Sequence, residues 1–333
     1  MGVLLKKRVD RLPVVCTGGM MNAAVVDIMN KTGHTLPAAH HDDVLMAELA
    51  YDVHENTGFE NLGIPFDVTV EAEAMGSEID FGTLSCEPKV AKETFPSVSK
   101  VVCKNIKDVM NSPRIHTIVQ AGYRLSRAYP DVPVIGNITG PITTTASFVD
   151  PVSFLKELRK DKEHSHRVID YISDVLTGYA RLMVDNGADL ISIGDPTASG
   201  EILGPATFEE YAVRYLNKII DGIHAVGAPV IVHICGNMKT VKHLLPQIRS
   251  AAISTDAMVS LRLLKRAHPQ LTTMGNISTY HLEFGTAGEI AKKAEKLVRD
   301  GVDIISPACG LSTSTPLENI RAMTGAVKGN LEH

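Results

Sequence analysis

The stretch Val230-Ile231-Val232-His233-Ile234-Cys235 joins a continuous aliphatic run to polar side chains at its end. A short, unbroken run of this kind, rich in β-branched residues, is typical of a strand that is buried on both faces of a parallel sheet. Seven further runs of the same character occur along the chain, at 13–16, 62–68, 133–137, 190–195, 252–256, 273–276 and 304–309.

The connections between the later runs have a helical pattern. Amphipathic stretches alternate with these strands, at 163–186, 207–226, 239–250, 258–268 and 287–300. Such alternation indicates parallel strands joined by helical crossovers, and eight strands predict a closed TIM-type (β/α)8 barrel that forms a single domain over 1–333. An open doubly wound sheet is the alternative, although no G-x-G-x-x-G turn follows a strand. The segment 20–60 is predicted to form extra N-terminal helices that cap the barrel mouth.

The composition limits the classes of function. The chain has 333 residues, of which 44% are hydrophobic and 21% charged, and its formal net charge is −5. This balance is typical of a globular protein with a sizeable core. Because no long basic or apolar run occurs, we expect neither a nucleic-acid nor a membrane partner. Five cysteines form no even framework, so we expect a reducing, cytoplasmic location in which cysteines serve catalysis or metal binding.

Polar residues end most of the predicted strands. In a TIM barrel the active site lies at the carboxyl ends of the strands, so these side chains should converge on one mouth. They are Asp67, Asn137, Asp195, His233, Cys235, Asp256, Asn276 and Cys309.

A metal site is the sharpest prediction at this mouth. His233 and Cys235 are two residues apart, so both side chains point to the same side of a strand, and Cys309 ends the last strand. One imidazole and two thiolates suit zinc, and three protein ligands leave a fourth place for a substrate. A single H-x-C motif also arises in ordinary cores, where buried cysteine is common. Cys16, at the end of the first predicted strand, could compete as a ligand.

Three stretches of the sequence resemble a known protein family. Val232-His233-Ile234-Cys235-Gly236-Asn237, Ser306-Pro307-Ala308-Cys309-Gly310 and Thr315-Pro316-Leu317-Glu318-Asn319 together resemble the methylcobamide:coenzyme M methyltransferases of the uroporphyrinogen decarboxylase superfamily. The likeness extends over nearly the whole chain and includes 73–79, 133–136, 139–141 and 194–196. It implies a TIM barrel with zinc on His233, Cys235 and Cys309. It also implies an additional acidic ligand at Asp256, where the family pattern is Glu; Asp256 could instead cap a helix.

The sequence departs from the decarboxylases of that superfamily. Where they carry a paired-arginine segment after the first strand, this chain reads Thr17-Gly18-Gly19-Met20-Met21-Asn22, and Cys309 stands where they have a histidine. Porphyrinogen decarboxylation is therefore not expected. Asp67 falls on their key aspartate, so it is a candidate proton donor or a contact for a cationic substrate. It could also be an exposed loop carboxylate.

Three other polar residues at strand ends have two interpretations each. Asp195 could line the pocket and orient His233 through its second ring nitrogen, or form a turn. Asn137 and Asn276, in similar Gly-Asn-Ile segments, could bind substrate or cap the helices that follow. The His40-His41 pair is predicted to lie on the surface.

The resemblance implies that a methyl group moves from a separate corrinoid carrier protein, bearing methylcobalamin or a related cofactor, to a zinc-bound thiol such as coenzyme M. A second hypothesis is the reverse direction, in which a small methyl ether or methylamine is demethylated onto a corrinoid protein with the help of zinc or Asp67. A third is a non-catalytic barrel in which the zinc is structural.

Overall fold

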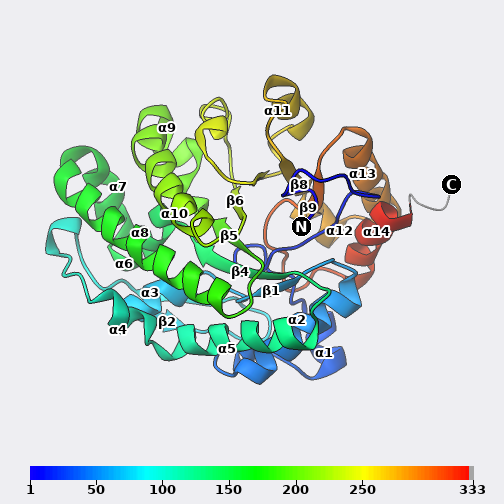
Figure 1. The fold of residues 1–333 in the computed structure, drawn as a ribbon, viewed down its shortest axis with the longest axis horizontal. Helices are drawn as coiled ribbons and strands as arrows, with labels where there is room; N and C mark the ends of the chain where they lie inside the picture. The colour runs from blue at the N-terminus through cyan, green and yellow to red at the C-terminus, as the bar shows by residue number, and fades with distance from the viewer. Residues whose placement is uncertain (330–333) are drawn as a thin grey trace.

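The computed structural model describes residues 1–329 and has a closed, strand-lined centre surrounded by helices (Figure 1). Seven parallel strands form one sheet whose order follows the chain. They are β1 (Leu62–Ile64), β4 (Val134–Thr139), β5 (Leu190–Gly194), β6 (Val230–Ile234), β7 (Ala252–Thr255), β8 (Thr273–Ile277) and β9 (Ile304–Pro307). Nearly every residue of these strands is buried, as expected for strands covered on both faces.

The first predicted strand closes the barrel, but it does so with few backbone pairs. Val14 forms an isolated parallel bridge with Ile305 of β9. On the other side, Asn61 replaces ladder hydrogen bonds with its side chain, since its Oδ1 accepts the Cys16 N–H at 3.0 Å and its Nδ2 donates to the Cys16 carbonyl at 2.8 Å. The predicted TIM-type barrel is therefore confirmed, with 13–16 as the eighth segment of the barrel wall.

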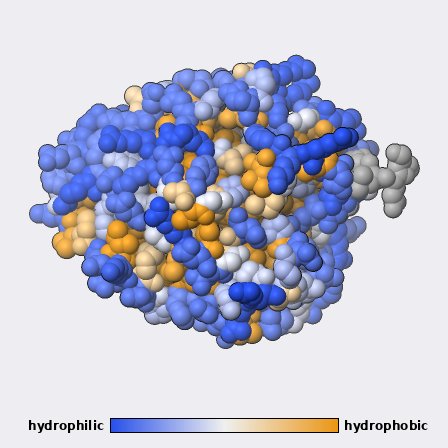
Figure 2. Space-filling model, viewed as in Figure 1, coloured by the Kyte–Doolittle hydropathy of each residue, from blue (hydrophilic) through white to orange (hydrophobic). Residues whose placement is uncertain are grey.

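Helices cover the outside of the barrel. They are α1 (Val26–Thr32), α2 (Asp43–Thr57), α3 (Val70–Met75), α4 (Ile106–Met110), α5 (Pro113–Ala128), α6 (Pro141–Phe148), α7 (Pro151–Lys160), α8 (Lys162–Asp185), α9 (Gly200–Thr207), α10 (Arg214–His224), α11 (Leu261–Ala267), α12 (Thr279–Phe284), α13 (Ala287–Arg299) and α14 (Leu317–Lys328). Within residues 1–329, no helix combines the length and apolar character needed to cross a membrane. Figure 2 shows a largely hydrophilic periphery, with hydrophobic side chains gathered toward the middle of this face.

Local sequence signals set several of these helix ends. The Asp42 side chain accepts the Val44 and Leu45 N–H groups and starts α2, and Gly58 ends it in the left-handed conformation at φ 78°. One predicted helix is wrong: 239–250 forms turns and a short 3-10 turn, η5 (Leu245–Gln247). Pro246 lacks an N–H and cannot continue a helix, so it interrupts the second half of this segment.

Two helices do occupy the predicted 20–60 segment, together with a 3-10 turn, η1 (Ala38–His40). Helix α2 packs against α5, β1 and α14, so it belongs to the outer layer of the barrel. The turn η1 instead brings His40 to Asp67, which follows β1 at the mouth. A capping role for this segment stays a prediction.

A second pair of strands lies outside the barrel. β2 (Glu78–Asp80) and β3 (Lys89–Lys92) form an antiparallel hairpin whose tip spans 81–88. The tip reaches the loop after β9, where the Thr313 hydroxyl donates to the Ser85 carbonyl at 2.9 Å. The hairpin thus connects the β1 side of the molecule with the loop that carries Cys309.

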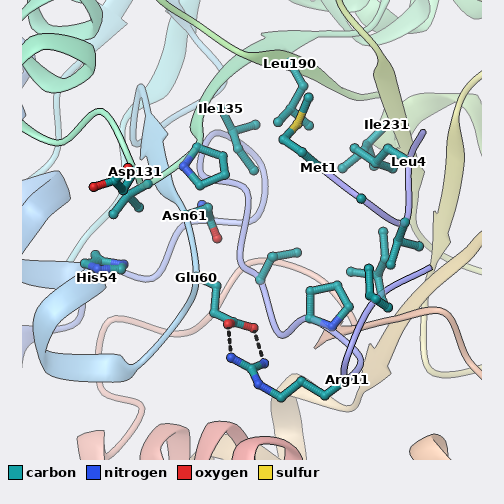
Figure 3. Close-up of a pocket in the computed structure, with 18 of the residues that line it drawn as sticks. Met1, Leu4, Arg11, His54, Glu60, Asn61, Asp131, Ile135, Leu190 and Ile231 are labelled. Carbon is teal, nitrogen blue, oxygen red and sulfur yellow. Dashed lines mark hydrogen bonds and ion pairs between the residues drawn. The ribbon is translucent and has the colours of Figure 1, made fainter. Parts of the chain in front are cut away.

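A cavity of about 440 Å³ lies at the opposite end of the barrel, between the strand starts and the N-terminal segment (Figure 3). Leu190 and Ile231 contribute its apolar wall, and the Arg11–Glu60 ion pair lies at its edge. TIM-barrel active sites form at the other end of the strands, so this cavity is not the candidate site.

Candidate metal centre

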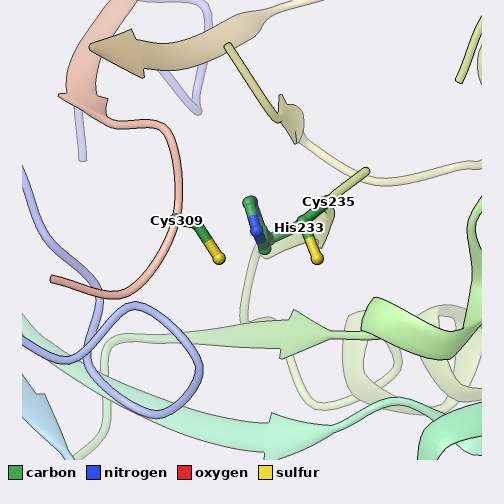
Figure 4. A group of neighbouring side chains, drawn as sticks. All are labelled: His233, Cys235 and Cys309. Carbon is green, nitrogen blue, oxygen red and sulfur yellow. The ribbon is translucent and has the colours of Figure 1, made fainter. Parts of the chain in front are cut away.

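Three of the predicted residues come together at the carboxyl ends of the strands. His233 lies in β6, Cys235 follows β6 directly, and Cys309 follows β9. The potential ligand atoms of these three side chains all lie within 4.8 Å of one another. Figure 4 shows the two sulfur atoms pointing into the same space, with Cys309 approaching from the side opposite Cys235. The group therefore has the composition and spacing of a zinc site with an open position.

The environment of His233 fits a metal ligand. Its side chain is wholly buried, and its Nδ1 lies 2.9 Å from the hydroxyl oxygen of Ser254 on β7. The Ser254 hydroxyl is directed to the Met21 sulfur, so its oxygen can accept the Nδ1 proton. Nε2 is then unprotonated, and it has no hydrogen-bond partner among the described residues. A buried imidazole nitrogen without a partner is costly unless something such as a metal ion engages it.

The two cysteine thiols change each other's acidity. A hydrogen bond from the Cys235 thiol, with a further contribution from His233, lowers the pKa of Cys309. The same hydrogen bond, together with burial, raises the pKa of Cys235. A divalent cation in the middle would favour ionisation of both thiols and hold both sulfur atoms as thiolates. The donor set therefore fits zinc.

Two other predicted or competing ligands lie outside this group. The Asp256 carboxylate accepts the Met258 N–H at 3.0 Å in a turn, and Ser260 caps α11, so the alternative of a helix cap at Asp256 is wrong. The Cys16 thiol is buried and donates to the Met21 carbonyl at 2.9 Å, and burial raises its pKa. Among residues 1–329, neither belongs to the His233–Cys235–Cys309 group. A ligand role for Asp256 stays a prediction.

Asp67 lies in a buried ion-pair network. Its carboxylate pairs with Arg114, which also contacts Glu73 at 2.9 Å, and the His40 Nδ1 lies 3.2 Å from it. Burial opposes ionisation, but Arg114 and His40 outweigh it and hold the pKa of Asp67 well below its usual range. The exposed-loop alternative for Asp67 is therefore wrong, as is the predicted surface position of His40, which is fully buried. The sequence could not show that a helix 47 residues away supplies Arg114.

Asp195 caps a helix. Its carboxylate accepts the Ile142 and Thr143 N–H groups at 3.2 and 2.8 Å, at the start of α6, and burial raises its pKa to about 6. Ser254, and not Asp195, contacts the second nitrogen of His233. A catalytic role for Asp195 stays a prediction, and so does one for Asp67.

The amide groups of the two predicted substrate-binding asparagines are engaged with the backbone. Asn137 Nδ2 donates to the carbonyls of Thr17 and Ile64, at 2.6 and 3.0 Å. Asn276 Nδ2 donates to the carbonyls of Asp256 and Val259, at 2.8 and 2.9 Å. These contacts hold the loops of the mouth in place. Substrate contacts by either residue stay a prediction.

Two residues near the metal group were missed by sequence reasoning. Ser254 pairs with His233 across β6 and β7, a register that the sequence does not display. Glu87, in the hairpin tip, lines a pocket of about 390 Å³ beside Cys309. Its only sequence signal is an acid next to Pro88 in an irregular stretch, which is too common to single out.

Fold and site define a TIM-type barrel with a thiol-rich group at its mouth that is competent to bind a metal. The family model of uroporphyrinogen decarboxylase (URO-D) matches residues 1–329, and the chain belongs to this family. It is 33% identical to a methylcobamide:CoM methyltransferase of Methanosarcina acetivorans, over 98% of this chain and 95% of the relative. A methylated-thiol–coenzyme M methyltransferase of Methanosarcina mazei is 26% identical, over 98% of this chain and 88% of the relative.

Solved structures agree with this assignment. A methyltransferase from Methanosarcina mazei superposes with a TM-score of 0.92 at 29% identity, covering 99% of this chain and 97% of that one. A B12-independent methionine synthase from Shewanella superposes with a TM-score of 0.58 at 14% identity, covering 97% and 99%, which shows a shared fold. The predicted family and barrel are thereby confirmed.

Proposed function

We propose that this protein is a zinc-dependent methyltransferase that moves a methyl group from a methylated corrinoid protein to a small thiol. The observation that carries the proposal is the unpartnered, buried Nε2 of His233 beside two cysteine sulfur atoms. The relatives support the methyl donor and the thiol acceptor, since several are named methylcobamide:CoM methyltransferases. Coenzyme M is the acceptor in those names.

The residues at this site would have different roles, which are zinc binding and orientation of a zinc ligand. His233, Cys235 and Cys309 would hold zinc, whose chemistry is to keep a bound thiol ionised at neutral pH. Ser254 orients the His233 ring, and the pocket beside Cys309 admits the thiol. The thiol proton leaves to solvent, the sulfur electron pair forms the C–S bond, and the C–Co bond breaks with its pair on cobalt, so cobalt(III) becomes cobalt(I).

The reverse reaction has less support. It would use zinc or Asp67 to assist the leaving group, but Arg114 keeps Asp67 ionised and neutralises its charge. A carboxylate that stays ionised at neutral pH does not donate protons efficiently. This contact favours the thiol as acceptor.

The test combines metal analysis with a spectral assay. The purified full chain should contain about one zinc, and methylcobalamin absorbance should fall only when a thiol is added. Cys309→Ser should lose both properties, whereas Cys103→Ser, which changes an exposed cysteine outside the hairpin tip, is the matched control. Zinc without thiol-dependent demethylation would contradict the proposal and favour the reverse reaction or a structural zinc. Absence of zinc from the purified protein would contradict the zinc dependence of the proposed reaction.

A further inference from the structure

The pocket beside Cys309 is the natural place for the thiol, because it is lined by a residue of the metal group. The hairpin tip and the loop after β9 form its walls, joined by the Thr313–Ser85 hydrogen bond. Gly310 allows the close approach of the 17–22 loop, since a Cβ there would lie 2.5 Å from the Met20 carbonyl. The lining residues are Met20, Ser85, Glu87, Cys309, Gly310, Leu311, Ser312 and Thr313.

Glu87 carries the one carboxyl group in this lining, which also contains the Cys309 thiol but no lysine, arginine or histidine. Within residues 1–329, its carboxylate makes neither a hydrogen bond nor an ion pair. Glu87 is exposed, so its carboxylate is accessible to a ligand in this pocket. An ionised carboxylate in the pocket repels an added anion and attracts an added cation.

Other acids surround the metal group. Asp256 follows β7 directly, at the same end of the barrel. Glu201 approaches the residue after Cys235, since a Cβ on Gly236 would lie 2.8 Å from its Oε1. Arg114, which lies beside Asp67, already pairs with two carboxylates. Lys239 and Lys242 line a separate groove, with Met258 and Leu263.

We infer that the acceptor pocket selects a thiol that carries a positively charged group, such as an aminothiol, in preference to a thiol that carries only an anion such as a sulfonate. Glu87 is the specificity-determining residue, and it would pair with an ammonium group while the sulfur lies near Cys309. This inference rests on the proposed function and narrows its substrate class.

Three thiols with the same two-carbon skeleton test it: 2-aminoethanethiol, 2-mercaptoethanol and 2-mercaptoethanesulfonate. Because these thiols differ in intrinsic acidity, the deciding quantity is how each variant changes the ratios of their kcat/KM values with methylcobalamin as donor. We expect Glu87→Gln to lower the preference for the ammonium over the hydroxyl thiol about tenfold, as for a lost charge-assisted hydrogen bond. Glu87→Lys should reverse the preference toward the sulfonate. Glu78→Gln, in the same hairpin and exposed, is the matched control.

Calorimetry of thiol binding to the zinc-loaded protein, without a methyl donor, gives a second readout, in which the Kd ratios should follow the same order. Unchanged ratios in Glu87→Gln would overturn the inference. So would a wild-type preference for the sulfonate that is lost in the double variant Lys239→Gln/Lys242→Gln, because the anion would then bind in the other groove. Failure of every thiol to react would contradict the proposed function, while the Kd ratios would still decide the charge preference.

Discussion

Replacing Ser254 by alanine should weaken zinc binding without unfolding the barrel. Ser254 is wholly buried, and its oxygen is the partner of His233 Nδ1 at 2.9 Å. Alanine removes one oxygen atom, so packing changes little, but it leaves a buried N–H without an acceptor. An unmet buried donor costs about 1–3 kcal/mol, and loss of the outer partner of a metal-bound histidine lowers metal affinity about 10- to 100-fold.

The two estimates agree, because a tenfold change in affinity corresponds to about 1.4 kcal/mol. The assay is competition for zinc between the protein and a chromophoric chelator at fixed pH, with the thermal midpoint of the metal-free protein measured in parallel. Ser192→Ala is the matched control, since Ser192 is a buried serine on β5 whose hydroxyl contacts Thr17 and not a ligand. Equal zinc affinity in Ser254→Ala and wild type would refute the role assigned to Ser254.

Three further outcomes are expected. Cys309→Ser should lose zinc and thiol methylation while circular dichroism stays unchanged; full zinc content would exclude Cys309 as a ligand. Asp67→Asn should lower the free energy of unfolding by about 3–5 kcal/mol, because it leaves the Arg114 charge buried with one partner fewer, yet thiol methylation by the folded enzyme should persist; abolished turnover would favour the reverse reaction. Burial raises the pKa of Glu71 to about 7. The contribution of Glu71 to stability is therefore complete below its ordinary pKa of 4.5 and is lost as pH rises through 7, so Glu71→Gln should be more stable than wild type at pH 8 by roughly 2–3 kcal/mol. Equal pH dependence of thermal unfolding in both proteins would contradict this.

Much of the fold could be predicted because the relevant signals are local. Strands covered on both faces must be continuously apolar, so 134–139, 190–194 and 230–234 are visible as runs. The one failed helix, at 239–250, shows the limit of periodicity, since Pro246 interrupts the second half of an amphipathic pattern. The eighth wall segment, 13–16, pairs partly through the Asn61 side chain, a contact that no strand pattern encodes.

The candidate site divides in the same way. His233 and Cys235 share a strand, and Cys309 ends another, so barrel topology alone predicts that they meet. The contacts of Asp67 with Arg114 and His40 join three separate segments, and the sequence could not reveal them. For that reason the exposed-loop alternative for Asp67 and the predicted surface position of His40 were wrong.

By itself, therefore, the sequence determined the strand-by-strand order of the barrel, the family and the three side chains at the centre of the site. These depend on hydrophobic period and on which residue ends each strand. Only the tertiary structure decided that Ser254 orients His233, that Asp195 caps α6 and that Glu87 lines the pocket beside Cys309. Strand register, loop path and ion pairing arise from packing between distant segments, and the free energy of each such contact depends on burial that the linear sequence does not contain.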